Sequence, residues 1–226
     1  VGVPGCGKSL TAKAVSSLWQ MPLLRLDVGQ LFSSYIGSTE ENMRKAIATA
    51  ESIAPCVLWI DEIEKGLSGI QGSDTADGGV SRRIFATLLT WMQEKLQPVF
   101  LVATANEVSS LPPEFLRKGR FDDIFFIDLP NAGERLEILS IHLGKRRRDP
   151  QRYDLAALAS KTDGFSGADL ESVIMESLET AFLEGRELTQ SDLESVASAC
   201  VPLAATMSEK IADVRRWAEG RARRAT

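Results

Sequence analysis

The chain has 226 residues, of which 44% are hydrophobic and 25% charged, and a formal net charge of -5 at pH 7. This length and apolar content allow one large domain, or a larger domain with a small companion. The acidic balance argues against non-specific binding of nucleic acid or of an anionic membrane by the chain as a whole. Basic patches at residues 146–148 and 215–224 are assigned no role, because arginines on a helix surface are usually solvated.

The cysteine spacing and the length of the apolar runs indicate the kind of compartment and whether this segment crosses a membrane. Cys6, Cys56 and Cys200 are far apart and match no metal-binding or disulfide pattern, which indicates a reducing compartment. No apolar run approaches the roughly twenty residues that a bilayer-spanning helix needs, and no signal segment opens the sequence. We therefore expect no membrane span in this segment. Because Val1 leads directly into the first motif, we also expect further chain upstream.

Short apolar runs alternate with helical patterns over the first 130 residues, as in a parallel sheet with covering helices. Strands are expected at residues 1–3, 23–27, 56–60, 99–103 and 123–127. Helices are expected between them at about residues 8–19, 39–53 and 80–94. These connections have the length that parallel strands require, so the sequence predicts a five-stranded parallel sheet flanked by helices.

The strand pattern stops at Pro130, and the remainder has helical patterns. Helices are expected at residues 132–143, 154–160, 166–184, 190–199 and 208–221. We place a domain boundary near Pro130, with a large α/β part at residues 1–130 and a small all-helical part at residues 131–226. The five glycines of residues 66–79 predict a mobile loop.

The segment Gly2-Val3-Pro4-Gly5-Cys6-Gly7-Lys8-Ser9 has the spacing of a phosphate-binding loop and lies between a strand and a helix. Its glycines let successive backbone N–H groups turn inward around phosphates, and the following helix offers its positive end. Lys8 would reach the outer phosphates and Ser9 would ligate magnesium, so ATP or ADP with Mg²⁺ are the expected cofactors. The residues expected to contact the nucleotide are Pro4, Gly5, Cys6, Gly7, Lys8, Ser9 and Leu10. The alternative is a chance glycine-rich turn.

Two further motifs complete a hydrolysis site. Residues 56–62 form an apolar strand that ends in Asp61 and Glu62, at the edge where open α/β sheets bind ligands. Asp61 would hold the magnesium shell, and Glu62 would orient and polarise the water that attacks the terminal phosphate. Asn106 follows the next strand and would position the same water. Plain turn residues, with Asn106 in an Asx-turn, are the alternative.

These motifs, in this order, resemble the AAA clade of the AAA+ ATPase superfamily over essentially the whole chain. Residues 103–106 resemble its sensor-1 segment, and residues 116–122 resemble the segment with the arginine finger. Residues 164–170 resemble the stretch where this clade replaces the sensor-2 arginine by alanine. The wording of residues 55–62 is most similar to poorly characterised AAA ATPases of plastid and cyanobacterial genomes and their bacterial relatives. The resemblance implies a P-loop NTPase fold followed by a helical lid.

The resemblance also implies that Arg120 completes the site of a neighbouring subunit in a homo-oligomeric, hexameric ring. Asp123 stands where the family often has a second arginine, which suggests slow turnover. His142, Gly167 and Ala168 match positions near the ribose or adenine, although a structural role on its helix is the alternative for His142. The compartment implied is the cytoplasm, or the plastid stroma for an organellar protein.

The residues Tyr35, Ile36 and Gly37 resemble the pore loop with which ring translocases grip a polypeptide. Alternatively, Tyr35 covers the edge of the sheet, and Ser34 stands where the family often has a basic residue. We predict an ATPase that hydrolyses ATP to remodel or translocate a protein partner. The alternative is a slow nucleotide-dependent regulatory scaffold that binds its partner without threading it. A nucleic-acid motor is disfavoured by the acidic balance.

Overall fold

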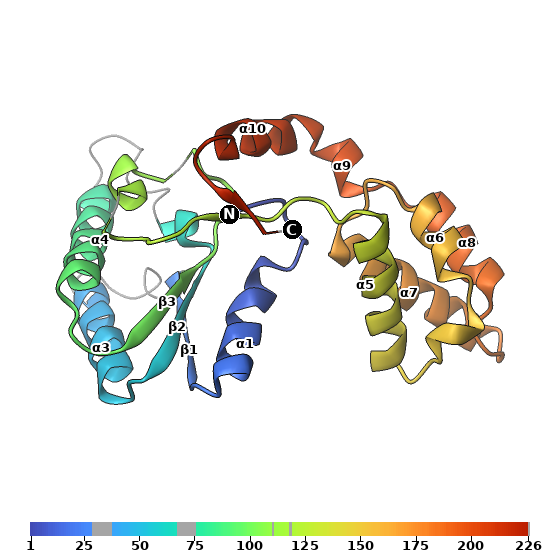
Figure 1. Cartoon of the computed structure of the whole chain (residues 1–226), viewed down its shortest axis with the longest axis horizontal. Helices are drawn as coiled ribbons and strands as arrows, with labels where there is room; N and C mark the ends of the chain where they lie inside the picture. The colour runs from blue at the N-terminus through green and yellow to red at the C-terminus, as the bar shows by residue number, and fades with distance from the viewer. Residues whose placement is uncertain (29–37, 67–75, 110, 118, 226) are drawn as a thin grey trace. The chain divides into compact units, whose positions relative to one another are not determined.

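The computed structural model describes residues 1–28, 38–66, 76–109, 111–117 and 119–225 (Figure 1). These residues divide into two compact units. The first, here the α/β unit, consists of residues 1–2, 8–126 and 220–225. The second, here the helical unit, consists of residues 3–7 and 127–219.

The α/β unit contains a parallel sheet in the order β1-β2-β3. Its strands are β1 (Leu23–Asp27), β2 (Cys56–Asp61) and β3 (Val99–Ala103). The central strand β2 is buried from its first residue to Ile60 and becomes partly accessible only at Asp61. A strand covered on both faces needs such a continuous apolar run, and its first polar residue marks the edge where the site begins.

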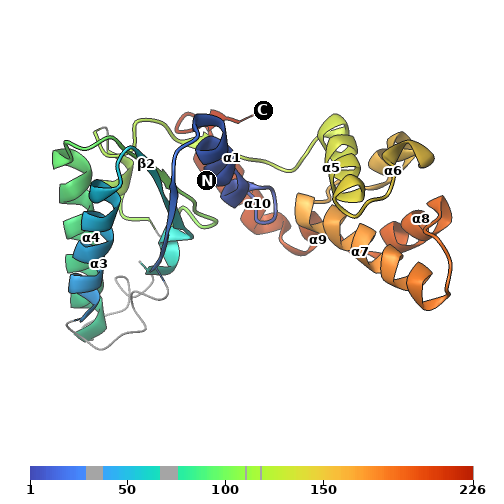
Figure 2. The same ribbon diagram turned by 90° about the horizontal axis from the view of Figure 1, so that it is seen from below.

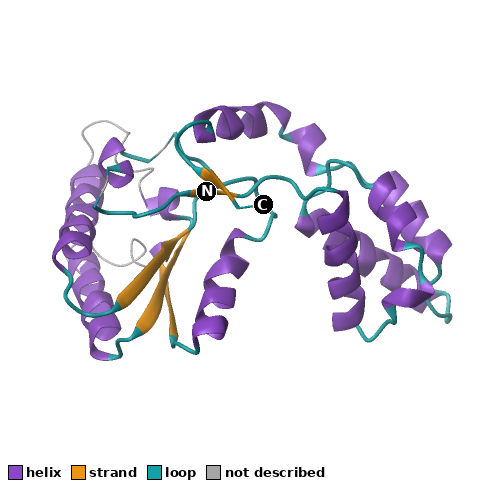
Figure 3. Ribbon diagram, in the orientation of Figure 1, coloured by secondary structure: helices purple, strands orange, loops and turns teal. Residues whose placement is uncertain are grey.

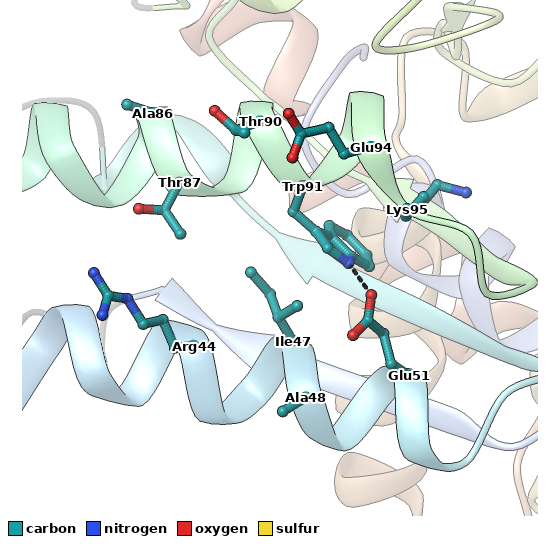
Figure 4. A pocket seen from close by; sticks show the side chains of 10 residues that line it. All are labelled: Arg44, Ile47, Ala48, Glu51, Ala86, Thr87, Thr90, Trp91, Glu94 and Lys95. Atoms are coloured by element: carbon teal, nitrogen blue, oxygen red, sulfur yellow. Dashed lines mark hydrogen bonds between the residues drawn. The ribbon is translucent and has the colours of Figure 1, made fainter.

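Helices cover both faces of this sheet. Helix α1 (Lys8–Trp19) packs on one face, and α3 (Ser38–Ser52) and α4 (Ala76–Glu94) lie side by side on the other (Figures 1 and 2). A shallow groove runs between α3 and α4, where the Trp91 indole N–H donates to Glu51 Oε1 at 2.8 Å (Figure 4). The core between the layers includes Met43, Leu58, Ile60, Ile84 and Leu88.

The predicted five-stranded sheet is wrong, because the main sheet has three strands in the part of the chain that the structure describes. Residues 1–3 donate hydrogen bonds to Phe125 O and Ile127 O, which form only a bridge at Gly2. Strand β4 (Phe125–Phe126) pairs instead with β5 (Arg223–Arg224) in a separate parallel pair. Strand β4 is only two residues long and the contact of residues 1–3 is a single bridge, so among the described residues neither segment forms a ladder with the main sheet.

The helical unit has the all-helical character that the sequence predicted (Figure 3). Its helices are α5 (Ala132–Lys145), α6 (Leu155–Lys161), α7 (Gly167–Leu183), α8 (Gln190–Ala199), α9 (Leu203–Thr206) and α10 (Ser208–Ala218). Capping boxes begin α5, through Asn131 and Glu134, and α7, through Ser166 and Asp169. The buried core of this unit consists mainly of leucines, together with Phe165, Val173, Ile174 and two alanines.

The helix ends mostly agree with the sequence patterns. Helices α1 and α8 span the predicted residues, whereas α4 begins earlier than predicted, at Ala76. Helix α10 ends at Ala218 and not near residue 221, because Gly220 takes a left-handed conformation with φ of 71° and redirects the chain into β5. Short 3-10 turns, at Ile63–Gly66, Pro113–Leu116 and Pro150–Arg152, complete the described structure. None of the described helices is long and apolar enough to cross a membrane.

Candidate functional site

The glycine-rich loop has the backbone conformation that its sequence requires. Gly5 and Gly7 have φ of 73° and 87°, values at which a side chain would be strained. Lys8 is the first residue of α1 and only 8% exposed, and its Nζ donates to Gly2 O at 2.9 Å. The Cys6 thiol contacts Pro4 O at 3.6 Å, and Leu10 on α1 is 59% exposed. A positive helix end behind a glycine turn is suited to binding an anion.

The structure brings Ser9 and Asp61 together at the carboxyl end of β2. Ser9 Oγ donates to Asp61 Oδ1 at 2.9 Å, and Thr104 Oγ1 donates to the same oxygen at 2.7 Å. Arg25 Nη2 lies 3.3 Å from the other carboxylate oxygen, Oδ2. The Arg25 guanidinium also stacks 4.9 Å from the centre of the Trp59 ring, which fixes its position.

This donor set fits magnesium. Mg²⁺ prefers oxygen ligands and commonly binds one or two protein groups, with water and phosphate oxygens filling its octahedral shell. The Ser9 hydroxyl and the Asp61 carboxylate, already 2.9 Å apart, are such groups. The described residues hold no cluster of three or more His, Cys, Asp or Glu side chains for a metal. A metal shared with phosphates does not need such a cluster.

Glu62 and Asn106 also meet, although 44 residues separate them. Asn106 Nδ2 donates to Glu62 Oε1 at 3.0 Å, and Lys65 Nζ forms an ion pair with Oε2. Glu62 has a φ of 49°, a left-handed conformation that turns the chain directly after β2. The side-chain amide of Asn106, which follows β3, therefore meets a carboxylate that follows the neighbouring strand β2.

Sequence reasoning missed Thr104 and Glu64. Thr104 is 4% exposed, and its hydroxyl accepts the Glu62 N–H at 3.0 Å while it donates to Asp61. Glu64 is 7% exposed, and its Oε1 accepts the Asn106 N–H at 2.9 Å. Thr104 had a usable signal, since it is the first polar residue after the apolar strand β3 at the ligand-binding edge. Glu64 had only the weak signal of an acid followed by a turn.

The described contacts of Arg120 and Asp123 are with residues outside this cluster. Arg120 Nη1 donates to Glu114 O, and its buried Nε has no hydrogen-bond partner among the described residues. Asp123 forms an ion pair with Arg223 of β5, with 3.2 Å between Oδ1 and Nη2. The acid at this position is therefore accompanied by a guanidinium from the far end of the chain.

In the helical unit, residues of the glycine loop pack closely on the start of α7. Gly5 O accepts the Ala168 N–H at 3.0 Å, and a Cβ on Gly167 would lie 3.1 Å from Gly5 O. His142 on α5 has no described contact with the glycine loop. Its Nδ1 lies 3.3 Å from Glu171 Oε1 and 3.3 Å from Arg146 Nη1. Burial lowers the pKa of His142 below its ordinary value, which favours the neutral ring.

The predicted pore-loop residues Tyr35, Ile36 and Gly37 lie outside the described residues, as do residues 67–75 of the glycine-rich segment. Their predicted roles remain predictions. No contact of the described residues bears on them.

The family model of the ATPase family associated with various cellular activities (AAA) matches residues 1–129, and that of the AAA+ lid domain matches residues 152–195. The chain therefore belongs to the AAA ATPase family, which confirms the resemblance seen in its motifs. The two matched segments correspond to the sheet with its helices and to the central helices of the helical unit.

Several similar proteins carry the description "uncharacterized AAA domain-containing protein ycf46". That of Pyropia yezoensis is 51% identical over 228 residues, which cover 100% of this chain and 46% of the relative. That of Guillardia theta is 48% identical over 219 residues, covering 96% of this chain and 43% of the relative. The peroxisomal ATPase pex1 of Schizosaccharomyces pombe is 36% identical over 175 residues, or 76% of this chain and 18% of the relative. The chain thus spans less than half the length of these relatives.

Proposed function

We propose that this chain binds ATP with Mg²⁺ and hydrolyses it. The observation that carries the proposal is the hydrogen-bonded cluster of Ser9, Asp61, Thr104, Glu62 and Asn106, which gathers two hydroxyls, two carboxylates and an amide at one sheet edge. Membership of the AAA ATPase family supports the same activity.

The side chains divide the work by their chemistry. The loop glycines and Lys8 hold the phosphates, and Ser9 and Asp61 hold Mg²⁺, which neutralises phosphate charge when bound. Glu62 accepts a proton from the attacking water. At the same time the water oxygen bonds to the terminal phosphorus, and the bond from that phosphorus to the departing ADP breaks. Asn106 holds the Glu62 carboxylate in the direction that this proton transfer needs.

The base and ribose are proposed to contact Gly167, Ala168 and His142, of which the first two adjoin Gly5. Arg120 is proposed to act on the nucleotide of a neighbouring copy in a homo-oligomeric ring, a hexamer by analogy with the family. A protein is the proposed partner, in the cytoplasm or in a plastid stroma, with Tyr35 as the gripping residue.

A glutamine substitution tests hydrolysis separately from binding. Glu62→Gln keeps the acceptor for Asn106 and removes the basic oxygen, so ATP affinity should persist while turnover falls by about 10²-fold to 10⁴-fold. Glu51→Gln on α3 is the matched control, because it alters a partly buried carboxylate that accepts one hydrogen bond, from Trp91, and has no described bond to the cluster. Turnover by Glu62→Gln at the wild-type rate would contradict the proposed role.

A slow regulatory scaffold is the second candidate, and one observation favours it. Both carboxylate oxygens of Glu62 are engaged, one by Asn106 and the other by Lys65, so one of these contacts must break before Glu62 can accept a proton from water. Lys65→Ala should then raise basal turnover, whereas a threading enzyme should respond mainly to partner protein. Loss of partner-stimulated turnover in Tyr35→Ala, with basal turnover kept, would favour threading and count against the scaffold.

A further inference from the structure

The pairing of β2 with β3 continues beyond the ends of both strands. Thr104 N donates to Ile60 O at 2.9 Å, and Ile63 N donates to Thr104 O at 3.0 Å. Between these two bonds, the positive φ of Glu62 turns its N–H out of the ladder, and the Thr104 hydroxyl accepts it at 3.0 Å. Side chains thus replace backbone partners where the ladder is interrupted, and the two segments are held together.

Glu64 forms a further hydrogen bond between the segments that follow β2 and β3. Its Oε1 accepts the backbone N–H of Asn106 at 2.9 Å, while its Oε2 is buried without a hydrogen-bond partner among the described residues. Burial of a carboxylate is unfavourable unless its hydrogen bonds compensate, and Glu64 is 7% exposed with one described bond. A side chain of this type is poorly suited to a purely structural role, which an apolar residue would fill at lower cost.

Asn106 is consequently fixed at two points. Glu64 holds its backbone N–H, and Glu62 accepts from its side-chain amide at 3.0 Å. With the backbone bond removed, rotation of the Asn106 peptide would carry the amide away from Glu62, because nothing else described holds that N–H. Displacement of a positioning group by about 1 Å is enough to slow an enzymatic step by about 10²-fold.

We propose that Glu64 is a positioning residue for hydrolysis, which acts by holding Asn106 so that its amide meets Glu62. This role rests on the proposed ATPase activity. Glu64 does not touch nucleotide or water in this assignment; it acts only through Asn106. The carboxylate is therefore dispensable as a charge, and what matters is an oxygen that accepts the Asn106 N–H.

Two substitutions of similar size separate the acceptor from the charge. Glu64→Gln keeps an amide oxygen for the Asn106 N–H, and its kcat for ATP should stay within about fivefold of wild type. Glu64→Met fills the same space without an acceptor, and its kcat should fall by about 10-fold to 100-fold while KM for ATP changes less than about threefold. Glu51→Ala on α3, which also removes a hydrogen-bonded carboxylate, is the control for general destabilisation and should keep the wild-type kcat.

A double-mutant cycle shows whether Glu64 acts through Asn106. Asn106→Ala removes the amide, so Glu64→Met should cost little further kcat in that background, less than about twofold. A structural role would lower kcat by the same factor in both backgrounds and would overturn the proposal. An unchanged kcat in Glu64→Met would overturn it as well.

The proposal can still be tested if one variant does not fold. Should Glu64→Met not fold at the assay temperature, Glu64→Gln decides, since a loss of kcat beyond about 10-fold would overturn the acceptor role. The ATPase activity of the wild-type protein separates the proposed function from the proposed role of Glu64. Wild-type protein without ATP hydrolysis contradicts the proposed function, whereas active wild type with an additive cycle contradicts only the role of Glu64.

Discussion

Polar contacts are arranged differently in the two units. In the helical unit, the capping boxes that begin α5 and α7 join residues three positions apart. At the edge of the α/β sheet, the hydrogen bonds among Ser9, Asp61, Glu62, Thr104 and Asn106 join residues 42 to 52 positions apart. The first kind of contact requires only a local helix start, whereas the second requires the whole sheet to be formed.

Two buried charges sharpen this difference. Arg135 in the helical unit is 5% exposed and has three described partners, the carbonyls of Ala159 and Pro130 and the carboxylate of Asp163. Glu64 in the α/β unit is similarly buried but has one oxygen without a described partner. We infer that the paired guanidinium of Arg135 stabilises the helical unit, and that the incompletely paired carboxylate of Glu64 serves the edge where chemistry is proposed.

The largest effect is expected from Lys8→Ala. Removal of the buried ammonium deprives phosphates of a charge-assisted donor, so ATP affinity should weaken by at least about 100-fold. Equilibrium binding of a fluorescent ATP analogue measures this. Lys145→Ala on α5 is the control and should bind normally. An unaltered affinity for ATP in Lys8→Ala would contradict the proposal that the α/β unit binds the phosphates through Lys8.

A large effect on stability, without one on chemistry, is expected from Arg135→Met. The substitution leaves the carbonyls of Ala159 and Pro130 without their donor, which should lower the free energy of unfolding by about 3 kcal/mol. Urea unfolding measures the loss, and kcat below the transition should match wild type. Arg216→Met provides the control, because its exposed pair with Asp213 should contribute less than about 0.5 kcal/mol. A specific loss of kcat would show that Arg135 serves more than packing.

Thr104→Val tests the bridging hydroxyl at the sheet edge. Valine keeps the shape but cannot bond Asp61 and Glu62 together, so stability should fall by about 1 kcal/mol and kcat by about 10-fold. Thr104→Ser keeps the hydroxyl and should restore most of kcat. Steady-state kinetics and thermal unfolding of both variants check this, and equal kcat in the two would argue against the bridge.

The smallest effect is expected from Arg223→Ala. Its ion pair with Asp123 is largely exposed, and the β4–β5 backbone pairing does not depend on the side chain, so the free energy of unfolding should change by less than about 0.5 kcal/mol. Arg224→Ala, the next residue of the strand, is the matched control. A loss above about 1.5 kcal/mol specific to Arg223 would mean that this pair organises the segment after Arg120.

Much of this organisation was predictable because it depends on local signals. Lys8–Trp19 reads as a helix from its own sequence, and the buried run that ends at Asp61 locates the sheet edge. The contact of Glu64 with Asn106 was not predictable, since it depends on the register of β2 and β3 that places the two residues side by side. Strand β5 was also missed, because Arg223 N and Ala225 N pair through backbone groups that leave no apolar pattern. The expected fifth strand failed because Phe125 and Phe126 are apolar but too few to extend the main ladder.

The most direct test of the central claim is the dependence of ATP binding on Mg²⁺ in wild type and in Asp61→Asn. If Ser9 and Asp61 hold the metal against the phosphates, Mg²⁺ should strengthen ATP binding to wild type by about 10-fold or more, and binding to Asp61→Asn by less than about threefold. An equal response to Mg²⁺ in both proteins, or no binding of ATP by wild type, would contradict the account.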